Sequence, residues 1–258
     1  GDDLTLWIRG DYVISGATLN RFFALHVIAL PLVLVILVFL HIIALHEVGS
    51  NNPDGVPIKK PKGSVPDEEK PKFKFHERFT KKYDIVDAIP FYPYYIVKDL
   101  VGIGIFLFLF CYVIFFMPEM GGFFLEPPNF EPANPLKTPE HIAPVWYFTP
   151  FYAILRAVPD KLFGVILMFA SIVLLALLPW LDRGRVRSIR YRSVLHKLNL
   201  AVFSVSFLVL GYLGTQPATP TATVFAQIFT FLYFAFFVLL FFYSKREKTK
   251  PVPERVTS

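Results

Sequence analysis

The chain has 258 residues, of which 54% are hydrophobic and 17% aromatic, and its formal net charge is +6. Apolar runs of about 18 or more residues are typical of membrane spans, so this composition indicates a helical membrane protein rather than a soluble domain. The runs do not alternate polar and apolar residues, which excludes a transmembrane barrel, and the basic segments flank the runs, which argues against a nucleic-acid partner.

The chain begins at Gly1, and GDDLTLWIRGDY has neither the basic start nor the apolar centre of a signal peptide. We therefore expect a piece of a longer protein whose upstream part is missing. The single cysteine, Cys111, lies in an apolar run, which excludes an intrachain disulfide and a zinc-type cluster. The predicted fold is an all-α polytopic transmembrane bundle with five spans: Phe22–His46, Val97–Met117, Leu162–Leu181, Leu198–Leu213 and Thr223–Tyr243.

The first span contains three histidines, although imidazole is costly in hydrocarbon unless something binds it. His26 and His41 are fifteen residues apart, which in an α-helix is roughly 22 Å along the axis and about 60° around it. One face thus presents a histidine near each membrane surface, and Pro31 between them can change the angle. Such a pair can hold two metal or haem centres or can serve helix packing, and geometry leaves both open. His46 is rotated about 140° from His41 and cannot easily share its ligand.

Lysine and arginine concentrate in three segments that follow the first, third and fifth spans, at residues 59–82, 182–197 and 244–255. The positive-inside rule places these segments on the cytoplasmic or matrix side. We divide the chain into an outer segment with the first span (1–47), a basic loop on the cytoplasmic or matrix side (48–96) and a region with the remaining spans (97–258). The middle of the loop 48–96 is rich in proline and lysine, so we expect it to be solvated and flexible. The loop 118–160 is aromatic and nearly uncharged, so we expect it to fold against the outer membrane surface.

Six motifs follow one another in an order that resembles cytochrome b of respiratory complex III, the quinol–cytochrome c reductase. They are TLNRFFALH, HIIALHEVGSNNPDG, PYYIVKDLVG, PVWYF, YAILRAVPDKLFGV and YLGTQP. The resemblance covers nearly the whole chain except the basic insert around residues 57–82. It implies the last five helices of an eight-helix protein, with the first three helices absent.

The resemblance implies that two histidines ligate two b-type haems. His26 resembles the ligand of the low-potential haem near the outer surface, and His41 resembles the ligand of the high-potential haem near the cytoplasmic surface. The spacing between them is one residue longer than is usual in complex III. The second axial ligands are expected from the missing upstream segment, because neither His196 nor His141 sits in the middle of a helix.

A quinone-reduction site is implied on the cytoplasmic side. His46 resembles the quinone-binding histidine of this site, and Asp99 resembles its partner carboxylate. Both groups can relay the two protons that quinone reduction consumes. Lys98 resembles a proton-uptake lysine, and Ser50 and Asn51 are expected as polar lining.

A quinol-oxidation site is implied on the outer side by the segment Pro144, Val145, Trp146 and Tyr147. The family usually has glutamate where this chain has Val145, and valine cannot take a proton from quinol. Either water takes the proton, or it passes to Glu140, His141 or Tyr147, with His141 ranked first because its ordinary pKa suits reversible transfer. Phe148 and Tyr152 are expected to line the same pocket.

The implied function is a catalytic subunit that oxidises ubiquinol near the outer surface and passes electrons through two b haems to ubiquinone in a proton-motive Q-cycle. The implied partners are the Rieske iron–sulfur protein, cytochrome c1, the N-terminal part of cytochrome b, the lipid membrane and a second copy in a dimeric complex. Lys161 at the outer surface either helps to dock the Rieske protein or contacts a lipid phosphate. A haem anchor without quinone chemistry would need neither Asp99 nor PVWY, and an ion transporter would need no haem. The basic insert and Val145 favour a bacterial plasma membrane over the mitochondrial inner membrane.

Overall fold

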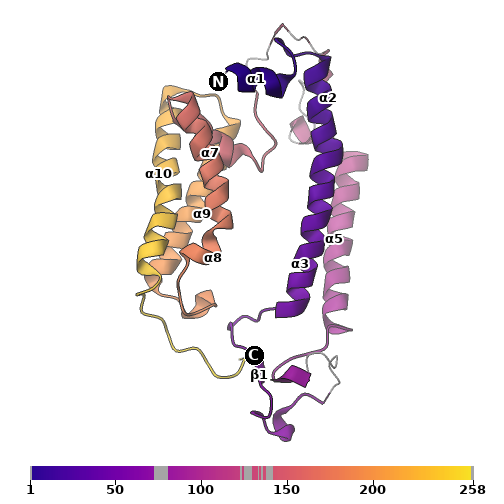
Figure 1. The fold of residues 1–258 in the computed structure, drawn as a ribbon, viewed down its shortest axis with the longest axis vertical. Coiled ribbons are helices and arrows are strands. Elements are labelled where there is room, and N and C mark those ends of the chain that lie inside the picture. Colours follow the sequence, from indigo (N-terminus) through magenta and orange to yellow (C-terminus); the bar gives the residue numbers. More distant parts are fainter. Residues whose placement is uncertain are drawn as a thin grey trace. The chain divides into compact units, whose positions relative to one another are not determined.

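The computed structural model describes residues 2–72, 81–122, 124, 130–132, 134, 136–137 and 142–256. The chain forms two compact units, and each unit is built from two separate stretches of sequence. Unit 1 comprises Gly1–Asn51 and Ile89–Glu140, and unit 2 comprises Asn52–Ala88 and His141–Ser258. Figure 1 shows the elements of both units.

Unit 1 contains two long helical segments. The first runs without interruption from Gly16 to Val48 and begins with a capping box, in which Ser15 and Thr18 satisfy each other's backbone N–H groups. The second is α5 (Tyr94–Phe116), and a short helix, α1 (Asp2–Arg9), precedes the first. The Arg21 guanidinium donates to the Trp7 carbonyl and so ties α1 to the long helix.

The long helix of unit 1 changes its hydrogen-bond pattern in one place. It consists of α2 (Gly16–Ala24), a π-helical turn η1 (Leu25–Ala29) and α3 (Leu30–Val48). In the π-turn the Leu30 N–H donates to the Leu25 carbonyl, five residues back instead of four. Pro31 is the second residue after this turn, in the first turn of α3.

Unit 2 is organised around a buried core between four helices: α6 (Thr149–Ala157), α7 (Lys161–Ala176), α9 (Val194–Thr215) and α10 (Pro220–Tyr243). The core side chains include Ile154, Leu210 and Phe237, which are almost completely buried. The Tyr233 hydroxyl donates to the Ser171 carbonyl at 2.9 Å, which joins α10 to α7 and satisfies a buried polar group.

Helix α6 fits between α7 and α9 because glycines on both neighbours allow close approach. A Cβ atom on Gly214 of α9 would lie 2.1 Å from the Thr149 carbonyl oxygen, and one on Gly164 of α7 would lie 2.6 Å from the Leu155 carbonyl oxygen. Both obstacles are backbone atoms, so the helices would have to separate. These two glycines therefore fix the position of α6.

Replacing Gly214 with alanine is expected to destabilise unit 2, by roughly 1–3 kcal/mol, because overpacking against a backbone carbonyl forces α9 away from α6. The matched control is Gly211→Ala, one turn earlier on α9, where the nearest atom to a new Cβ is 3.6 Å away. Thermal unfolding in detergent should give a lower midpoint for Gly214→Ala and a nearly unchanged one for Gly211→Ala. Equal shifts in the two variants would contradict this packing argument.

The basic segments that were predicted on one side of the membrane come together within unit 2. Asp54, which is buried, accepts hydrogen bonds from Arg190 at 3.0 Å and from the Tyr191 hydroxyl at 2.7 Å. Arg255 in the C-terminal segment pairs with Asp87 at 2.6 Å and with Glu69 at 2.5 Å. The grouping agrees with the positive-inside assignment.

The loop 48–96 is more ordered than its composition predicted. Strands β1 (Lys59–Pro61) and β2 (Tyr83–Ile85) pair antiparallel, with Lys60 opposite Asp84. The Asp84 carboxylate is buried and accepts from the Gly63 N–H at 2.7 Å, so it holds the turn after β1. Burial alone would raise the pKa of Asp84, but the hydrogen bonds and Lys62 outweigh it and keep the pKa below 3.8. This order concerns residues 48–72 and 81–96, whereas residues 73–80 in the basic middle lie outside the described residues, so the expected flexibility of the middle stays a prediction.

Within the part of the chain that the structure describes, four helices are long and apolar enough to cross a membrane: Gly16–Val48, Tyr94–Phe116, Val194–Thr215 and Pro220–Tyr243. The third predicted span, Leu162–Leu181, is divided into α7 and a short helix α8 (Leu178–Leu181). The break falls at Leu177, and Pro179 lacks the N–H that would continue the α-helical pattern. The predicted all-α membrane bundle is confirmed, with four full-length spans and one shorter apolar helix among the described residues.

Candidate functional site

The two histidines predicted to bind haem lie on the long helix of unit 1. His26 is inside the π-turn, and His41 is in α3, on the other side of Pro31. Both side chains are exposed, and no residue of the π-turn or of α3 is buried within the chain. Each imidazole is therefore available to a group that packs against this helix.

The donor set of this helix fits an axial haem ligand better than a protein-caged ion. Among the described residues, no group of three or more His, Cys, Asp or Glu side chains converges on a point that could hold a metal. A b-type haem brings its own four nitrogen ligands and needs only axial imidazoles from the protein. One isolated histidine near each end of an apolar helix meets that need.

The residues predicted to bind quinone on the cytoplasmic side lie at one end of unit 1. His46 is in the last turn of α3, which Gly49 ends with a φ of 85° and an N–H bond to the Leu45 carbonyl at 2.7 Å. Lys98 and Asp99 are in the second turn of α5. Figure 1 shows that α3 ends and α5 begins at the same end of this unit. Ser50 and Asn51 follow Gly49 directly, so all five predicted residues belong to this end.

The predicted quinol-oxidation segment forms a turn that leads into α6. The Phe148 N–H donates to the Val145 carbonyl at 2.8 Å, and the Thr149 hydroxyl donates to the Trp146 carbonyl at 2.6 Å. Pro144 is half-buried, whereas the next four side chains are exposed. The Tyr147 ring packs against both neighbours, edge-on to Trp146 at 5.5 Å and tilted to Phe148 at 4.9 Å between ring centroids. The segment thus presents a short aromatic surface on a fixed turn.

Tyr152 is held in place by two contacts. Its hydroxyl donates to the Ile142 carbonyl at 3.0 Å, and the Arg156 guanidinium lies 4.7 Å from its ring centroid. Arg156 in turn donates to the Leu213 and Gln216 carbonyls at 2.8 and 2.9 Å. The end of α9 therefore fixes Tyr152 beside the turn, which brings this predicted residue together with the segment Pro144–Phe148. Glu140 and His141, the other two predicted proton acceptors, lie outside the described residues.

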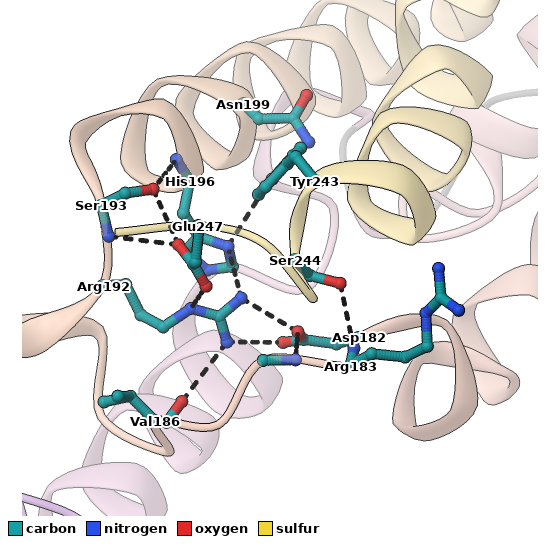
Figure 2. Close-up of polar contacts among 11 residues, drawn as sticks. Asp182, Arg183, Val186, Arg192, Ser193, His196, Asn199, Tyr243, Ser244 and Glu247 are labelled. Carbon is teal, nitrogen blue, oxygen red and sulfur yellow. Dashed lines mark hydrogen bonds and ion pairs between the residues drawn. The ribbon is translucent and has the colours of Figure 1, made fainter. Parts of the chain in front are cut away.

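A buried polar cluster at the opposite end of α9 was not predicted from the sequence. Figure 2 shows Arg192 at its centre, with two hydrogen bonds to Asp182 at 2.8 and 2.9 Å and an ion pair to Glu247 at 2.5 Å. The Ser193 hydroxyl and N–H donate to the same Glu247 carboxylate at 2.7 and 3.2 Å. The cluster joins the end of α8, the start of α9 and the segment after α10.

The only histidine of α9, His196, is part of this cluster and lies in the first turn of the helix. His196 Nδ1 lies 3.0 Å from an Arg192 nitrogen and 3.2 Å from the Tyr243 hydroxyl, as Figure 2 shows. Sequence reasoning set His196 aside only because it was near a helix end. Arg192 precedes α9 in extended backbone, so no helical spacing in the sequence indicated its contact with His196.

Acid is expected to weaken this cluster. Burial alone would raise the pKa of Asp182, but hydrogen bonds from Arg192 and the Gly184 N–H outweigh it, so the pKa lies below its ordinary value of 3.8. The folded-state pKa is thus the lower one, and the stabilisation is complete above about pH 5 and is lost as the pH falls through 3.8 and then through the folded-state value.

Trp180 in α8 is exposed and lies two residues before Asp182, so its fluorescence can report the loosening. In a variant with Trp7→Phe and Trp146→Phe, we expect a change in emission on acidification from about pH 7 to about pH 2. Adding Asp182→Asn should remove the part of the fluorescence change that begins near pH 3.8, because asparagine does not take up a proton there. An acid response that is identical with and without Asp182→Asn would contradict the assignment.

Comparisons with known proteins agree over the entire chain. Residues 1–150 match the family described as cytochrome b(N-terminal)/b6/petB, and residues 132–234 match the family described as cytochrome b(C-terminal)/b6/petD. The chain is 57% identical to cytochrome b of Allochromatium vinosum, over 100% of this chain and 60% of that protein. It is 46% identical to cytochrome b of Rickettsia bellii, over 99% of this chain and 57% of that protein.

A solved structure described as a hyperthermophilic respiratory Complex III superposes with a TM-score of 0.76 at 36% identity. The superposition covers 95% of this chain and 55% of that one. The chain therefore spans less than two thirds of the length of these relatives.

Proposed function

This chain belongs to the cytochrome b family, and on that premise we propose that it is the haem- and quinone-binding part of a quinol–cytochrome c reductase subunit. In this proposal it oxidises ubiquinol near the outer membrane surface and passes electrons through two b haems to ubiquinone on the cytoplasmic side. The observation that carries the proposal is the long helix Gly16–Val48, which bears one exposed histidine toward each end of its apolar stretch.

We assign His26 to the low-potential haem and His41 to the high-potential haem, each as one axial ligand. When bound, the two haems supply one-electron carriers at two depths of the membrane. The remaining axial ligands are assigned to the N-terminal part of cytochrome b, outside this chain. The place of His196 in the first turn of α9, away from the middle of that helix, supports this assignment.

The cytoplasmic end of unit 1 is proposed as the quinone-reduction site. His46 and Asp99 bind the two carbonyl oxygens of the quinone and deliver the two protons that its reduction consumes. Lys98, one residue away on an exposed turn of α5, hands protons from water to Asp99. Ser50 and Asn51 complete the polar rim.

The turn Pro144–Phe148 is proposed as the floor of the quinol-oxidation site. The exposed aromatic rings bind the quinol head group, and Val145 leaves the turn without a carboxylate. The phenol of Tyr147 is exposed, whereas the proton of the Tyr152 hydroxyl is donated to the Ile142 carbonyl. Proton acceptance is therefore assigned to His141 first, with Tyr147 and Glu140 as the alternatives, and Tyr152 orients the turn.

The partners follow from the same proposal. The Rieske iron–sulfur protein takes one electron from quinol at the outer surface and passes it to cytochrome c1, and the complex is a dimer. Lys161 supports a docking role because it is exposed in the first turn of α7, directly after the α6 segment that carries the quinol turn. The solved complex III with a similar chain supports this assembly.

The proposal is tested by reduced-minus-oxidised optical spectra of the assembled complex during a redox titration. Two b-type signals that titrate at separate potentials are expected, because the two haems lie at different depths in different surroundings. A complex that contains this chain and gives only one b-type signal, or none, would refute the proposed function.

A further inference from the structure

The π-turn Leu25–Ala29 contains one of the two proposed haem ligands, so its winding affects the direction in which that ligand faces. The residues on both sides of it, Ala24 and Leu30, have ordinary α-helical backbone angles, so the helix continues through the turn. The turn contains His26 and ends at Ala29, directly before Leu30. His41 lies in the regular α-helix that follows. A change of winding here rotates His26 relative to everything that follows.

Pro31 gives a physical reason for the widened turn. Proline has no N–H, and in an α-helix its ring clashes with the carbonyl four residues back, which here belongs to Val27. A π-turn that ends two residues before the proline moves these carbonyls away from the ring while the flanking residues stay helical. The hydrogen bond from the Leu30 N–H to the Leu25 carbonyl is the signature of this arrangement.

The widened turn takes up one residue without advancing the helix. Between His26 and His41 the helix then behaves as fourteen α-helical steps instead of the fifteen in the sequence. Fourteen steps give a rise of about 21 Å and place the two histidines about 40° apart around the axis. If one more residue were removed from the regular part of α3, the angle would become about 140°, and the histidines would face nearly opposite sides.

We propose that the π-turn Leu25–Ala29 is the positioning element that sets the angle at which His26 and His41 face the haems, since regular α-helical winding over the same fifteen residues would turn His26 by about 100° to the other side of His41. This inference rests on the proposed haem ligation. It predicts that the helix can lose one residue inside the turn without moving His26, because the extra residue itself is then gone and the proline clash is taken up as an ordinary kink. The same loss within α3 leaves the extra residue in the turn, which Pro31 holds open, and therefore rotates His26 away.

Two deletions in the assembled, haem-loaded complex test the proposal. Deletion of Ile28 removes a residue from the π-turn, and deletion of Val35 removes a residue of similar size from α3 between Pro31 and His41. Haem bound per cytochrome b should stay near the wild-type value after deletion of Ile28 and fall by about half after deletion of Val35. The low-spin electron paramagnetic resonance signal of the low-potential haem should persist in the first variant and vanish in the second.

The outcomes separate this inference from the proposed function. A wild-type complex without two b haems would remove the premise, and both conclusions would fall. If the wild-type complex has both haems, equal haem contents in the two deletion variants, or a larger loss after deletion of Ile28, would overturn the positioning role alone. Deletion of Val27, which also removes one residue from the π-turn, is a second variant in case the deletion of Ile28 prevents folding. If neither variant accumulates in the membrane, that result also counts against the proposal.

Discussion

Replacing His26 with leucine is expected to remove one b haem from the assembled complex and to leave the other, and His41→Leu is expected to do the converse. Leucine has a similar volume and suits an apolar helix, but it offers no lone pair to iron. The helix should still form, because its exposed face is already apolar. Haem bound per protein should fall by about half in each variant, and redox titration should show that a different b-type signal is missing in each.

The matched control for these two variants is His46→Leu on the same helix. His46 lies five residues after His41 and is rotated about 140° from it, so both haems should remain while quinone reduction fails. Retention of both b-type signals in His26→Leu or in His41→Leu would overturn the ligand assignment for that histidine. Loss of a haem in His46→Leu would show that the end of α3 is assigned wrongly.

Replacing Asp99 with asparagine is expected to slow quinone reduction by about 10²-fold or more, because the amide keeps the shape of the carboxylate but cannot carry a proton. The measured quantity is the rate at which added ubiquinone reoxidises the haem assigned to His41, recorded across the pH range. The wild-type rate should fall at high pH, where proton delivery becomes limiting. The variant should be slow throughout and should lose this pH dependence.

Asp67→Asn provides the matched control for Asp99→Asn. Asp67 is an exposed aspartate that pairs with Lys70 at 2.6 Å at the surface of unit 2, and exposed pairs of this kind contribute little. It should leave the rate and its pH profile unchanged. If Asp99→Asn behaves like Asp67→Asn, Asp99 has no part in proton delivery.

The apolar spans could be predicted because their signal is local. Each long run of hydrophobic residues became helical, and the errors fall where capping or proline decides the boundary. The fourth predicted span, Leu198–Leu213, begins at Val194 instead, because the Ser193 hydroxyl accepts from the His196 N–H and caps four further residues. Helix α6 was missed because it is short and lies in a proline-rich segment, where its stability comes from packing against Gly164 and Gly214.

Contacts between distant parts of the sequence could not be predicted. Asp54 and Arg190 are 136 residues apart, and nothing near either residue indicates the other. The ion pair between Arg192 and Glu247 could not be predicted either, because charged residues beside membrane spans are usually solvated. The positions of the histidines in the first span could be predicted, because residue spacing along one helix fixes them. The π-turn that alters this spacing could not be predicted, because it depends on a backbone hydrogen bond.

The discontinuous composition of unit 2 has a consequence for biosynthesis. Residues 52–88 leave the ribosome before α5 is made, yet their partners, Arg190, Tyr191 and Arg255, are synthesised more than a hundred residues later. The carboxylates of Asp54 and Asp87 therefore stay solvated while α5 and the helices after it enter the bilayer. The pairing of Arg255 with Asp87 becomes possible only after α10 has been translated, so it forms later than the described spans.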